Sequence, residues 1–341
     1  MKVDILGLPQ AGQQELFGIL TGVALDHIRQ RLMEVQLGAC NVRDPRIARF
    51  VEMYRPKKTT YARIEYSLLP DFTTQGPAKT LIAGEIRNAD EICWVSRAAT
   101  AESDIAGFIS ELIIGDLLLV EKRLENIARE LKSKQSEERL KEKALMEQFK
   151  QHLDQEKPLS TIVLNDEQNK MLRAYQFLSL KPVVLVINVP EDRIKDDSIT
   201  AAIKQKYHYP CIQLSAGLEA EISQLSEEER GEFMKEMGID EPAVDKMNRL
   251  VYEGLGLISF FTVGEDEVRA WPVRKGASAA EAGGVIHTDI AKGFVRAEHM
   301  AYGDLIALGS EAKVKEAGKF SLKGRDYLVA DGDVLSFRFN V

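Results

Sequence analysis

The sequence predicts an α/β protein: a doubly wound sheet, an inserted helical hairpin and a small C-terminal module rich in strands. Apolar strand-like runs alternate with helical stretches over residues 1–103 and again over residues 158–256. A heptad-type apolar stripe interrupts this alternation between residues 104 and 157. From residue 257 onward the pattern changes to short strands separated by turns.

The chain opens with a strand at residues 3–6, a glycine-containing turn and a helix. The helix is expected from the apolar spacing of Leu16, Phe17, Ile19 and Leu20. Further strands are expected at residues 61–69, 91–98, 181–189 and 210–215. The run KPVVLVINV at 181–189 is continuous and β-branched, as in a parallel strand that is covered on both faces.

Residues 104–157 predict an antiparallel helical hairpin with its tip near residues 133–136, ended by Pro158. The apolar stripe of its first helix is Leu117, Val120, Leu124, Ile127 and Leu131, and that of its second is Leu140, Leu145, Phe149 and Leu153. A third helix over residues 165–178 leads back to the sheet. The hairpin is either an arm that binds a partner or a charged hairpin that packs only on itself.

Composition excludes several classes of protein. The chain has 341 residues, 45% of them hydrophobic, which is enough for two or three domains with real cores. A net charge of -8 argues against a generally basic nucleic-acid binder, and no DNA partner is expected. Cys40, Cys93 and Cys211 are too widely spaced for a disulfide framework or a zinc site. No run approaches 18 apolar residues, so we expect a soluble cytoplasmic protein without a membrane partner.

Several local expectations concern the rest of the chain. Ser226 is expected to cap a helix together with Glu229, and residues 240–241 should precede the next helix. In the C-terminal module, strands are expected at LISFFTV, EVRAWPV, AGGVIHT and DYLVADGDVLSFRFNV, with turns at residues 264–265 and 331–333. His287 is expected to be a hydrogen-bonded structural residue, and Trp94 and Trp271 to be core or half-buried. Surface positions are expected for His27, His152, His208 and His299.

Residues 7–14, GLPQAGQQ, have the frame of a phosphate-binding loop, G-x-x-x-x-G-K-[ST]. Gly7 and Gly12 hold the glycine positions, whereas Gln13 and Gln14 replace the Lys and the Ser or Thr. Because backbone N–H groups at a helix N-terminus can hold a phosphate without any side chain, weak nucleotide binding is still possible.

These features resemble the YchF-type, Obg-like ATPase family of P-loop NTPases over nearly the whole chain. GLPQAGQQELFGILTG resembles the family's phosphate loop, SELIIGDLLLVEKRLENIARELK its helical arm and SLKPVVLVINVPED its base-recognition strand. Residues 267–341 resemble its TGS domain, a β-grasp, ubiquitin-like fold. The resemblance implies a P-loop NTPase-like domain at 1–103 and 158–256, an inserted arm at 104–157 and a TGS domain at 257–341. It also implies an NTPase that prefers ATP to GTP, binds Mg²⁺ and associates with the ribosome.

The resemblance further implies a set of nucleotide-binding residues. In the base-reading N-x-x-E motif, Asn188 and Glu191 would contact the base edge, with Ser215 and Ala216 in the following loop. The alternative for Asn188 is an ordinary turn residue after a strand. The loop residues implied are Gly7, Pro9, Gln10, Ala11, Gly12, Gln13 and Gln14.

The departures from the family gather at the terminal phosphate and the metal. Leu68 and Asp71 stand where the family's D-x-x-G has Asp and Gly, and the switch I segment is deleted. The segment that carries the family's proposed catalytic His is cut to ATAESD. We therefore expect no catalytic residue and no metal ligand, which puts magnesium in doubt and leaves ATP, ADP, GTP or GDP as candidate ligands.

Three functions follow from these residues. The favoured one is a pseudo-NTPase that acts as an interaction protein, docking on the ribosome or RNA through the arm and the TGS module. A second is an active ATPase in which Lys57 or Lys58 replaces the lost Lys. A third is a sensor that binds a nucleoside diphosphate without magnesium. RNA phosphates would meet a basic face of Arg269, Arg274, Lys275, Lys292 and Arg296.

Overall fold

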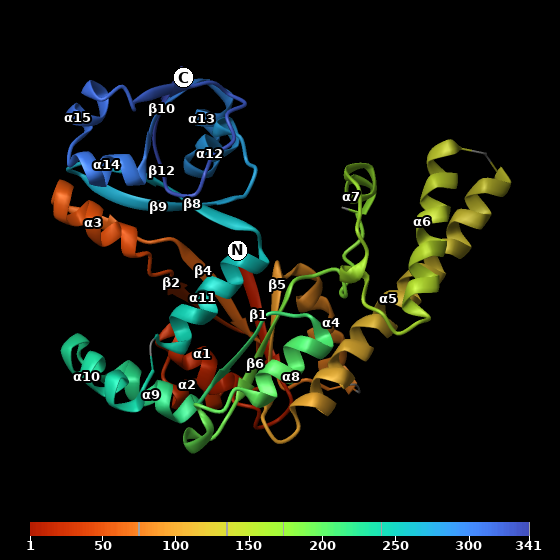
Figure 1. Ribbon diagram of the computed structural model, residues 1–341. Coiled ribbons are helices and arrows are strands. Elements are labelled where there is room, and N and C mark those ends of the chain that lie inside the picture. The colour runs from red at the N-terminus through yellow and green to blue at the C-terminus, as the bar shows by residue number, and fades with distance from the viewer. Residues whose placement is uncertain (74–75, 134–135, 173, 240, 341) are drawn as a thin grey trace. The chain divides into compact units, whose positions relative to one another are not determined.

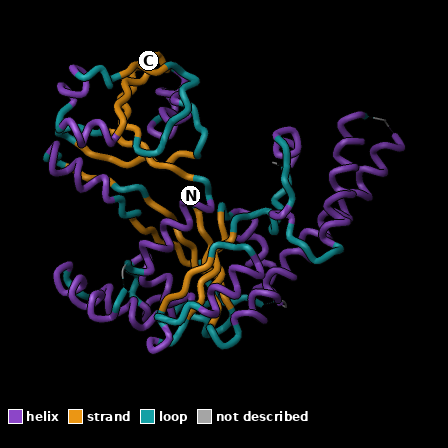
Figure 2. Tube along the Cα trace, viewed as in Figure 1, coloured by secondary structure: helices purple, strands orange, loops and turns teal. Residues whose placement is uncertain are grey.

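The computed structural model describes residues 1–73, 76–133, 136–172, 174–239 and 241–340 (Figure 1). The chain divides into two compact units, Met1–Gly38 with Glu65–Val244, and Ala39–Ile64 with Asp245–Val341. Each unit contains one six-stranded sheet with helices (Figure 2), which confirms the expected α/β class. Contacts place residues 39–64 with the C-terminal residues, a grouping that the expected domain boundaries do not contain.

The sheet of the first unit has the strand order β2-β4-β1-β5-β6-β7. Strand β1 (Lys2–Gly7) pairs in parallel with β4 (Arg63–Leu68) and β5 (Glu91–Arg97). Parallel pairing continues through β6 (Val183–Asn188) to β7 (Cys211–Leu214). All these strands were expected, and β6 is buried along its apolar run. The edge strand β2 (Gln36–Asn41) was missed.

Helices follow most of these strands. They are α1 (Gln13–Thr21), α2 (Leu25–Arg29), α4 (Gly76–Asn88), α5 (Ala101–Ser133), α6 (Glu137–Leu153), α7 (Asp166–Leu172), α8 (Ser198–Tyr207), α9 (Ala216–Gln224) and α10 (Glu227–Met237). Two 3-10 turns, η1 (Leu159–Thr161) and η2 (Glu191–Arg193), complete the set. One apolar core runs from the sheet into the arm, with Trp94 stacked on Phe108 at a ring-centroid distance of 4.2 Å. The Ser226–Glu229 capping box at α10 is confirmed.

The expected hairpin consists of α5, 33 residues long, and α6. Val120, Ile127 and Phe149 are fully buried, as the apolar stripe predicted, but Leu140 is 51% exposed and does not belong to the core. The end of α5 falls within the expected tip, of which residues 134–135 lie outside the described residues. The third helix is described as α7 (Asp166–Leu172). Arg173 lies outside the described residues, and residues 174–178, which were expected to belong to this helix, are not helical.

A carboxylate inside the hairpin joins its two helices. Glu142 is 2% exposed and accepts hydrogen bonds from Arg123 at 2.6 and 3.0 Å and from Arg139 at 2.5 Å. Burial raises the pKa of Glu142, but hydrogen bonds from Arg123, Tyr175 and Arg139 outweigh burial and lower it to about 2. The hairpin is therefore stabilised by a charge network as well as by its apolar stripe.

The sheet of the second unit is mixed, with the order β11-β10-β12-β8-β9-β3. Strands β8 (Leu257–Thr262) and β9 (Glu267–Arg274) form a hairpin across the expected turn, and β12 (Asp333–Phe339) runs parallel to β8. Antiparallel pairing then adds β10 (Phe294–Ala301) and β11 (Ser321–Lys323). At the other edge β3 (Lys58–Thr60) pairs in parallel with β9.

The prediction of one strand in this unit was wrong. Residues 282–286 of AGGVIHT belong to α12 (Ala279–Ile286), which starts with a capping box of Ser278 and Glu281, and its last two residues, His287 and Thr288, lie at the start of the next helix. The other helices are α3 (Pro45–Tyr54), α11 (Ala243–Gly254), α13 (Thr288–Lys292), α14 (Tyr302–Leu308) and α15 (Glu311–Glu316). The strand pattern had therefore concealed several short helices.

Both faces of this sheet are covered. Phe260 and Phe261 are adjacent on β8, so their side chains point to opposite faces. Phe261 packs with Phe50 of α3, at a ring-centroid distance of 5.1 Å, whereas Phe260 shares a core with Ala279 of α12. Residues 39–64 thus complete one of the two cores of the second unit.

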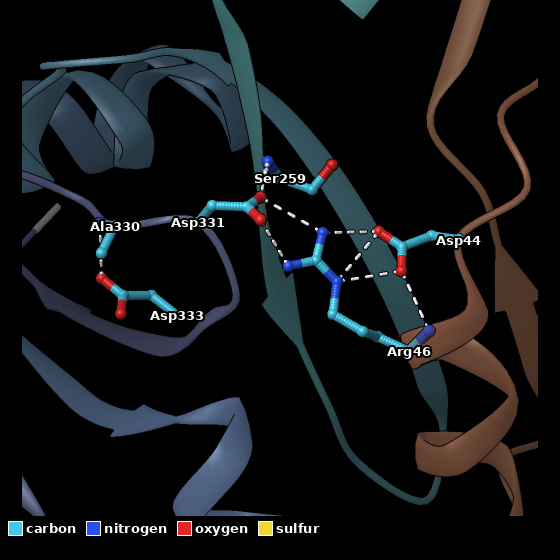
Figure 3. Close-up of polar contacts among 6 residues, drawn as sticks. All are labelled: Asp44, Arg46, Ser259, Ala330, Asp331 and Asp333. Carbon is cyan, nitrogen blue, oxygen red and sulfur yellow. Dashed lines mark hydrogen bonds and ion pairs between the residues drawn. The ribbon is translucent and has the colours of Figure 1, made fainter. Parts of the chain in front are cut away.

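Arg46 of α3 adds polar contacts to this packing (Figure 3). Its guanidinium donates to Asp44 at 2.8 Å and to Asp331 at 2.7 Å, and it lies 4.9 Å from the centroid of the Phe261 ring. Asp331 in turn accepts from the Ser259 backbone N–H at 2.9 Å. Burial opposes the charge of Arg46, but the hydrogen bonds to Asp44 and Asp331 outweigh burial and raise its pKa above its ordinary value.

The remaining local expectations have mixed outcomes. Trp94 is buried, Trp271 is half-buried, and His287 caps α13 by accepting from the Asp289 backbone N–H at 3.3 Å. His299 is not a surface residue: its Nε2 lies 2.9 Å from Asp333 and its Nδ1 lies 3.1 Å from Ser321. Across the described ranges, no helix combines the length and apolar character that a bilayer crossing requires.

Candidate functional site: a glycine loop and an adjoining cleft

The expected strand, turn and helix come together around loop 7–14. Strand β1 ends at Gly7, the Ala11 N–H donates to the Leu8 carbonyl at 3.1 Å, and α1 begins at Gln13. Gly12 has a φ of 102°, which favours glycine, and a Cβ there would lie 2.3 Å from Asn188 Nδ2. A Cβ at Gly7 would lie 2.6 Å from the Val95 carbonyl oxygen. Both glycines are therefore required by the packing of this loop.

Gln13, at the position of the Walker Lys, turns into the protein. The residue is 1% exposed, and its Nε2 donates to the Leu8 carbonyl at 3.2 Å and to Asp71 Oδ1 at 2.6 Å. Both partners only accept hydrogen bonds, so the orientation of the amide is determined. The buried Oε1 has no hydrogen-bond partner among the described residues. A neutral amide and a carboxylate therefore meet where a functional loop carries an ammonium group.

The segment that carries Asp71 is held beside β1. The Leu69 N–H donates to the Ile5 carbonyl at 3.0 Å, and the Phe72 N–H donates to the Gly7 carbonyl at 2.8 Å. The Phe72 ring packs edge-on against Trp94, with centroids 5.1 Å apart. Backbone pairing and aromatic packing on either side of Asp71 thus position its carboxylate at the loop.

A cleft of about 780 Å³ adjoins the loop on the expected base side. It is bounded by the carboxyl ends of β5 and β6 and by the start of α9, the edge at which parallel sheets usually bind ligands. The structure brings five of the expected nucleotide-binding residues to its wall: Gln10, Asn188, Glu191, Ser215 and Ala216. The others, Gly7, Pro9, Ala11, Gly12, Gln13 and Gln14, belong to the loop itself.

Asn188 connects the loop to α9. Its Nδ2 donates to the Ala11 carbonyl at 3.1 Å, and its Oδ1 accepts from the Ala216 N–H at 3.2 Å. This amide therefore positions two backbone segments around the cleft. Glu191 contributes the carboxylate of the motif, and its Oε1 lies 2.9 Å from the place of a Cβ on Gly217. The glycine at 217 leaves room for that carboxylate.

Sequence reasoning missed Arg97 and Gly217, which also line the cleft. Arg97 is the last residue of β5 and pairs in register with Asn188. Arg97 lies at the carboxyl end of β5, next to β6, which carries Asn188. Ligands usually bind at this edge of a parallel sheet, and that position could have identified Arg97 from the sequence. Gly217 directly follows the expected Ser215 and Ala216, but only the position of Glu191 reveals its role.

Two buried carboxylates lie in the strands themselves, Glu91 at the start of β5 and Asp4 within β1. Burial and the neighbouring charge of Asp90 raise the pKa of Glu91 to about 8. Burial also raises the pKa of Asp4, to about 6. Glu91 begins β5, whereas the cleft lies at that strand's carboxyl end, so we assign it no part in ligand binding. Within the described residues, no group of three or more His, Cys, Asp or Glu side chains could hold a metal ion.

The two lysines expected as possible replacements for the lost Lys lie in the second unit. Lys57 pairs with Asp266 at 2.8 Å, and Lys58 pairs with Glu267 at 3.2 Å. Each ammonium group is therefore matched by a carboxylate on the neighbouring β8–β9 hairpin.

Comparisons with known proteins agree with this geometry. Residues 257–340 match the family described as YchF-GTPase_C, a protein of unknown function (DUF933). The Ribosome-binding ATPase YchF of Bacillus subtilis (strain 168) is 34% identical, with 100% of both chains covered. The protein of the same name from Haemophilus influenzae is 32% identical, over 100% of this chain and 99% of the relative.

A solved structure extends the agreement to the fold. The Schizosaccharomyces pombe YchF GTPase matches with a TM-score of 0.86 and 27% identity, over 99% of this chain and 97% of that one. Sequence identity above 30% over at least 99% of each compared sequence, together with this structural match, leads to one conclusion. The chain belongs to the YchF family.

Proposed function

We propose that this chain is a ribosome-associated interaction protein that retains a nucleotide cleft but does not hydrolyse nucleoside triphosphates. Its relatives at 32 to 34% identity are named ribosome-binding ATPases, which supports the ribosome as partner. One observation carries the loss of hydrolysis: the side chain of Gln13 is an amide hydrogen-bonded to Asp71. Phosphoryl transfer depends on cations that neutralise the developing charge, and this pair supplies none.

Nucleotide binding is supported from the base side. The cleft places Asn188, Glu191 and Ser215 at the carboxyl ends of β6 and β7, beside the loop. An adenine or guanine nucleotide is the proposed ligand. Magnesium is not part of the proposal, because Gln14 replaces the Ser or Thr hydroxyl that would bind it.

Phosphate release from ATP and GTP tests the catalytic part of the proposal. We expect no Mg²⁺-dependent release above background, with or without ribosomes, under conditions in which the Bacillus subtilis relative serves as the active comparison. Gly12→Ala is the diagnostic variant, since a Cβ there disturbs the loop by its contact with Asn188. Thermal melts must show that this destabilised variant is still folded at the assay temperature. Mg²⁺-dependent turnover by the wild-type chain would refute the proposal, and its loss in a Gly12→Ala variant that remains folded would assign that turnover to the loop.

Ribosome association should depend on the second unit, whose proposed TGS module carries exposed basic residues. Arg274, Lys275, Lys292 and Arg296 are exposed, whereas Arg269 lies 3.7 Å from the centroid of the Trp271 indole ring. Contacts between such groups and RNA phosphates weaken as salt rises. Deleting residues 257–341 would be a poor test, because residues 39–64 belong to the same unit.

Substitutions within the full chain avoid that difficulty. In co-sedimentation with ribosomes, the wild-type chain should pellet with or without nucleotide. The double change Arg274→Glu with Lys275→Glu should reduce the pelleted fraction several-fold and flatten its salt dependence. Lys313→Glu, an exposed lysine of α15 in the same unit, is the matched control. Failure of the wild-type chain to pellet, or pelleting only with ATP and Mg²⁺, would contradict the proposal.

A further inference from the structure

Hydrogen-bond acceptors converge on one end of the glycine loop. The Gln13 amide lies between the Leu8 carbonyl and Asp71 Oδ1, and its own Oε1 is directed toward Gly7, 3.3 Å from the place of a Cβ there. In a functional loop the side chain at this position reaches the β and γ phosphates. The partners of Gln13 therefore lie at the end of the loop where terminal phosphate charge would arrive.

At this end of the loop, the Gln13 amide cannot flip, and the Asp71 carboxylate cannot donate a hydrogen bond. Flipping the Gln13 amide would direct Oε1 at the Leu8 carbonyl and the Asp71 carboxylate, both of which only accept hydrogen bonds. In the observed orientation, the buried and unpaired Oε1 can accept a hydrogen bond but cannot donate one to a phosphate oxygen. The carboxylate adds a negative charge where the Lys of a functional loop would add a positive one.

We propose that Asp71 is an internal anion that takes the place of a terminal phosphate, so that the site selects nucleoside diphosphates over triphosphates. This inference rests on the proposed nucleotide-binding cleft and adds its phosphate specificity. The backbone N–H groups in the first turn of α1 have no hydrogen-bond acceptor within the helix. They are therefore available to bind the remaining phosphates. The backbone pairing of Leu69 and Phe72 with β1 holds the backbone of Asp71 beside the loop.

Calorimetric titration of the full chain with ADP, ATP, GDP and GTP, without Mg²⁺, tests the inference. The wild-type chain should bind the diphosphate of one base at least about tenfold more tightly than its triphosphate, a difference of about 1.4 kcal/mol. Asp71→Asn preserves the size of the side chain and removes its charge. It should raise triphosphate affinity about tenfold and change diphosphate affinity much less.

The matched control is Asp192→Asn, which removes a carboxylate from the base side of the same cleft. It should alter the affinities for diphosphate and triphosphate by the same factor. Gln13→Lys offers a second route, because an ammonium beside Asp71 neutralises the carboxylate in place. It too should narrow the preference for diphosphate, and thermal melts of each variant would confirm that it is folded.

The outcomes separate this inference from the proposed function. If the wild-type chain binds nucleotide but the ratio of diphosphate to triphosphate affinity is unchanged in both Asp71→Asn and Gln13→Lys, the role of Asp71 is refuted and the cleft stands. If neither the wild-type chain nor any variant binds a nucleotide, the nucleotide cleft itself is refuted. A wild-type chain that binds ATP as tightly as ADP also overturns the inference.

Discussion

Replacing Arg46 by Ala tests whether residues 39–64 are an integral part of the second unit. The side chain of Asp44 is 12% exposed, so losing its charged partner costs about 2 kcal/mol. The side chain of Asp331 is 51% exposed, and that ion pair contributes about 0.5 kcal/mol. The contact with the Phe261 ring adds about 0.5 kcal/mol. We therefore expect Arg46→Ala to lower the unfolding free energy of this unit by about 3 kcal/mol.

The two tryptophans of the chain make the measurement specific, because Trp94 lies in the first unit and Trp271 in the second. In a Trp94→Phe background, Trp271 fluorescence during urea unfolding reports the second unit alone. A loss of about 3 kcal/mol should lower the urea midpoint by roughly 1 to 2 M. Arg49→Ala is the control: its side chain is 63% exposed on the same helix, and its loss should cost less than about 0.5 kcal/mol. Equal midpoints for the two variants would refute the assignment of α3 to this unit.

Three further predictions concern the first unit. Gly12→Ala should lower its unfolding free energy by more than about 2 kcal/mol in urea followed by Trp94 fluorescence, because of the strained φ and the clash with Asn188. The pKa of Glu91, about 8, lies above its unfolded value, so its protonated form stabilises the fold and melting temperatures should fall as pH rises from about 5 to 8. Glu91→Gln should flatten that dependence. The pKa of Glu142, about 2, lies below its unfolded value, so its stabilisation is present above about pH 4.5 and is lost as pH falls toward 2. Glu142→Gln should weaken the hairpin by about 1 to 3 kcal/mol, measured by hydrogen exchange in α5 and α6.

Each of these has a control. Gly84→Ala in α4 adds a methyl group where nothing lies within 4 Å, and it should not destabilise the unit. A pH slope that is unchanged in Glu91→Gln would show that other groups cause it. Glu138→Gln changes an exposed carboxylate on the same helix as Glu142. It should change the opening free energy measured by hydrogen exchange by less than about 0.5 kcal/mol. Equal effects at positions 138 and 142 would contradict the buried role of Glu142.

Some strands were predictable because their signal is local. The runs that became β1, β5 and β6 are buried, largely apolar and continuous, so their neighbours along the chain suffice to identify them. AGGVIHT was wrongly predicted to be a strand, because a short apolar run is equally compatible with a strand and with a helix. The deciding signal was the capping box of Ser278 and Glu281 at the start of α12. Strand β3, three residues long, has no recognisable periodicity and is defined only by its pairing with β9.

By itself, the sequence determined the family, the order of most elements in the first unit and the loss of the Lys from the loop, because each is a matter of residue identity and spacing. Only the tertiary structure decided that β3 joins the C-terminal sheet, that residues 39–64 complete one of that unit's cores, and that Asp71, 58 residues beyond Gln13, accepts its amide. Hydrogen bonds and cores depend on which distant segments become neighbours. That proximity arises from chain folding and is absent from any local pattern of residues.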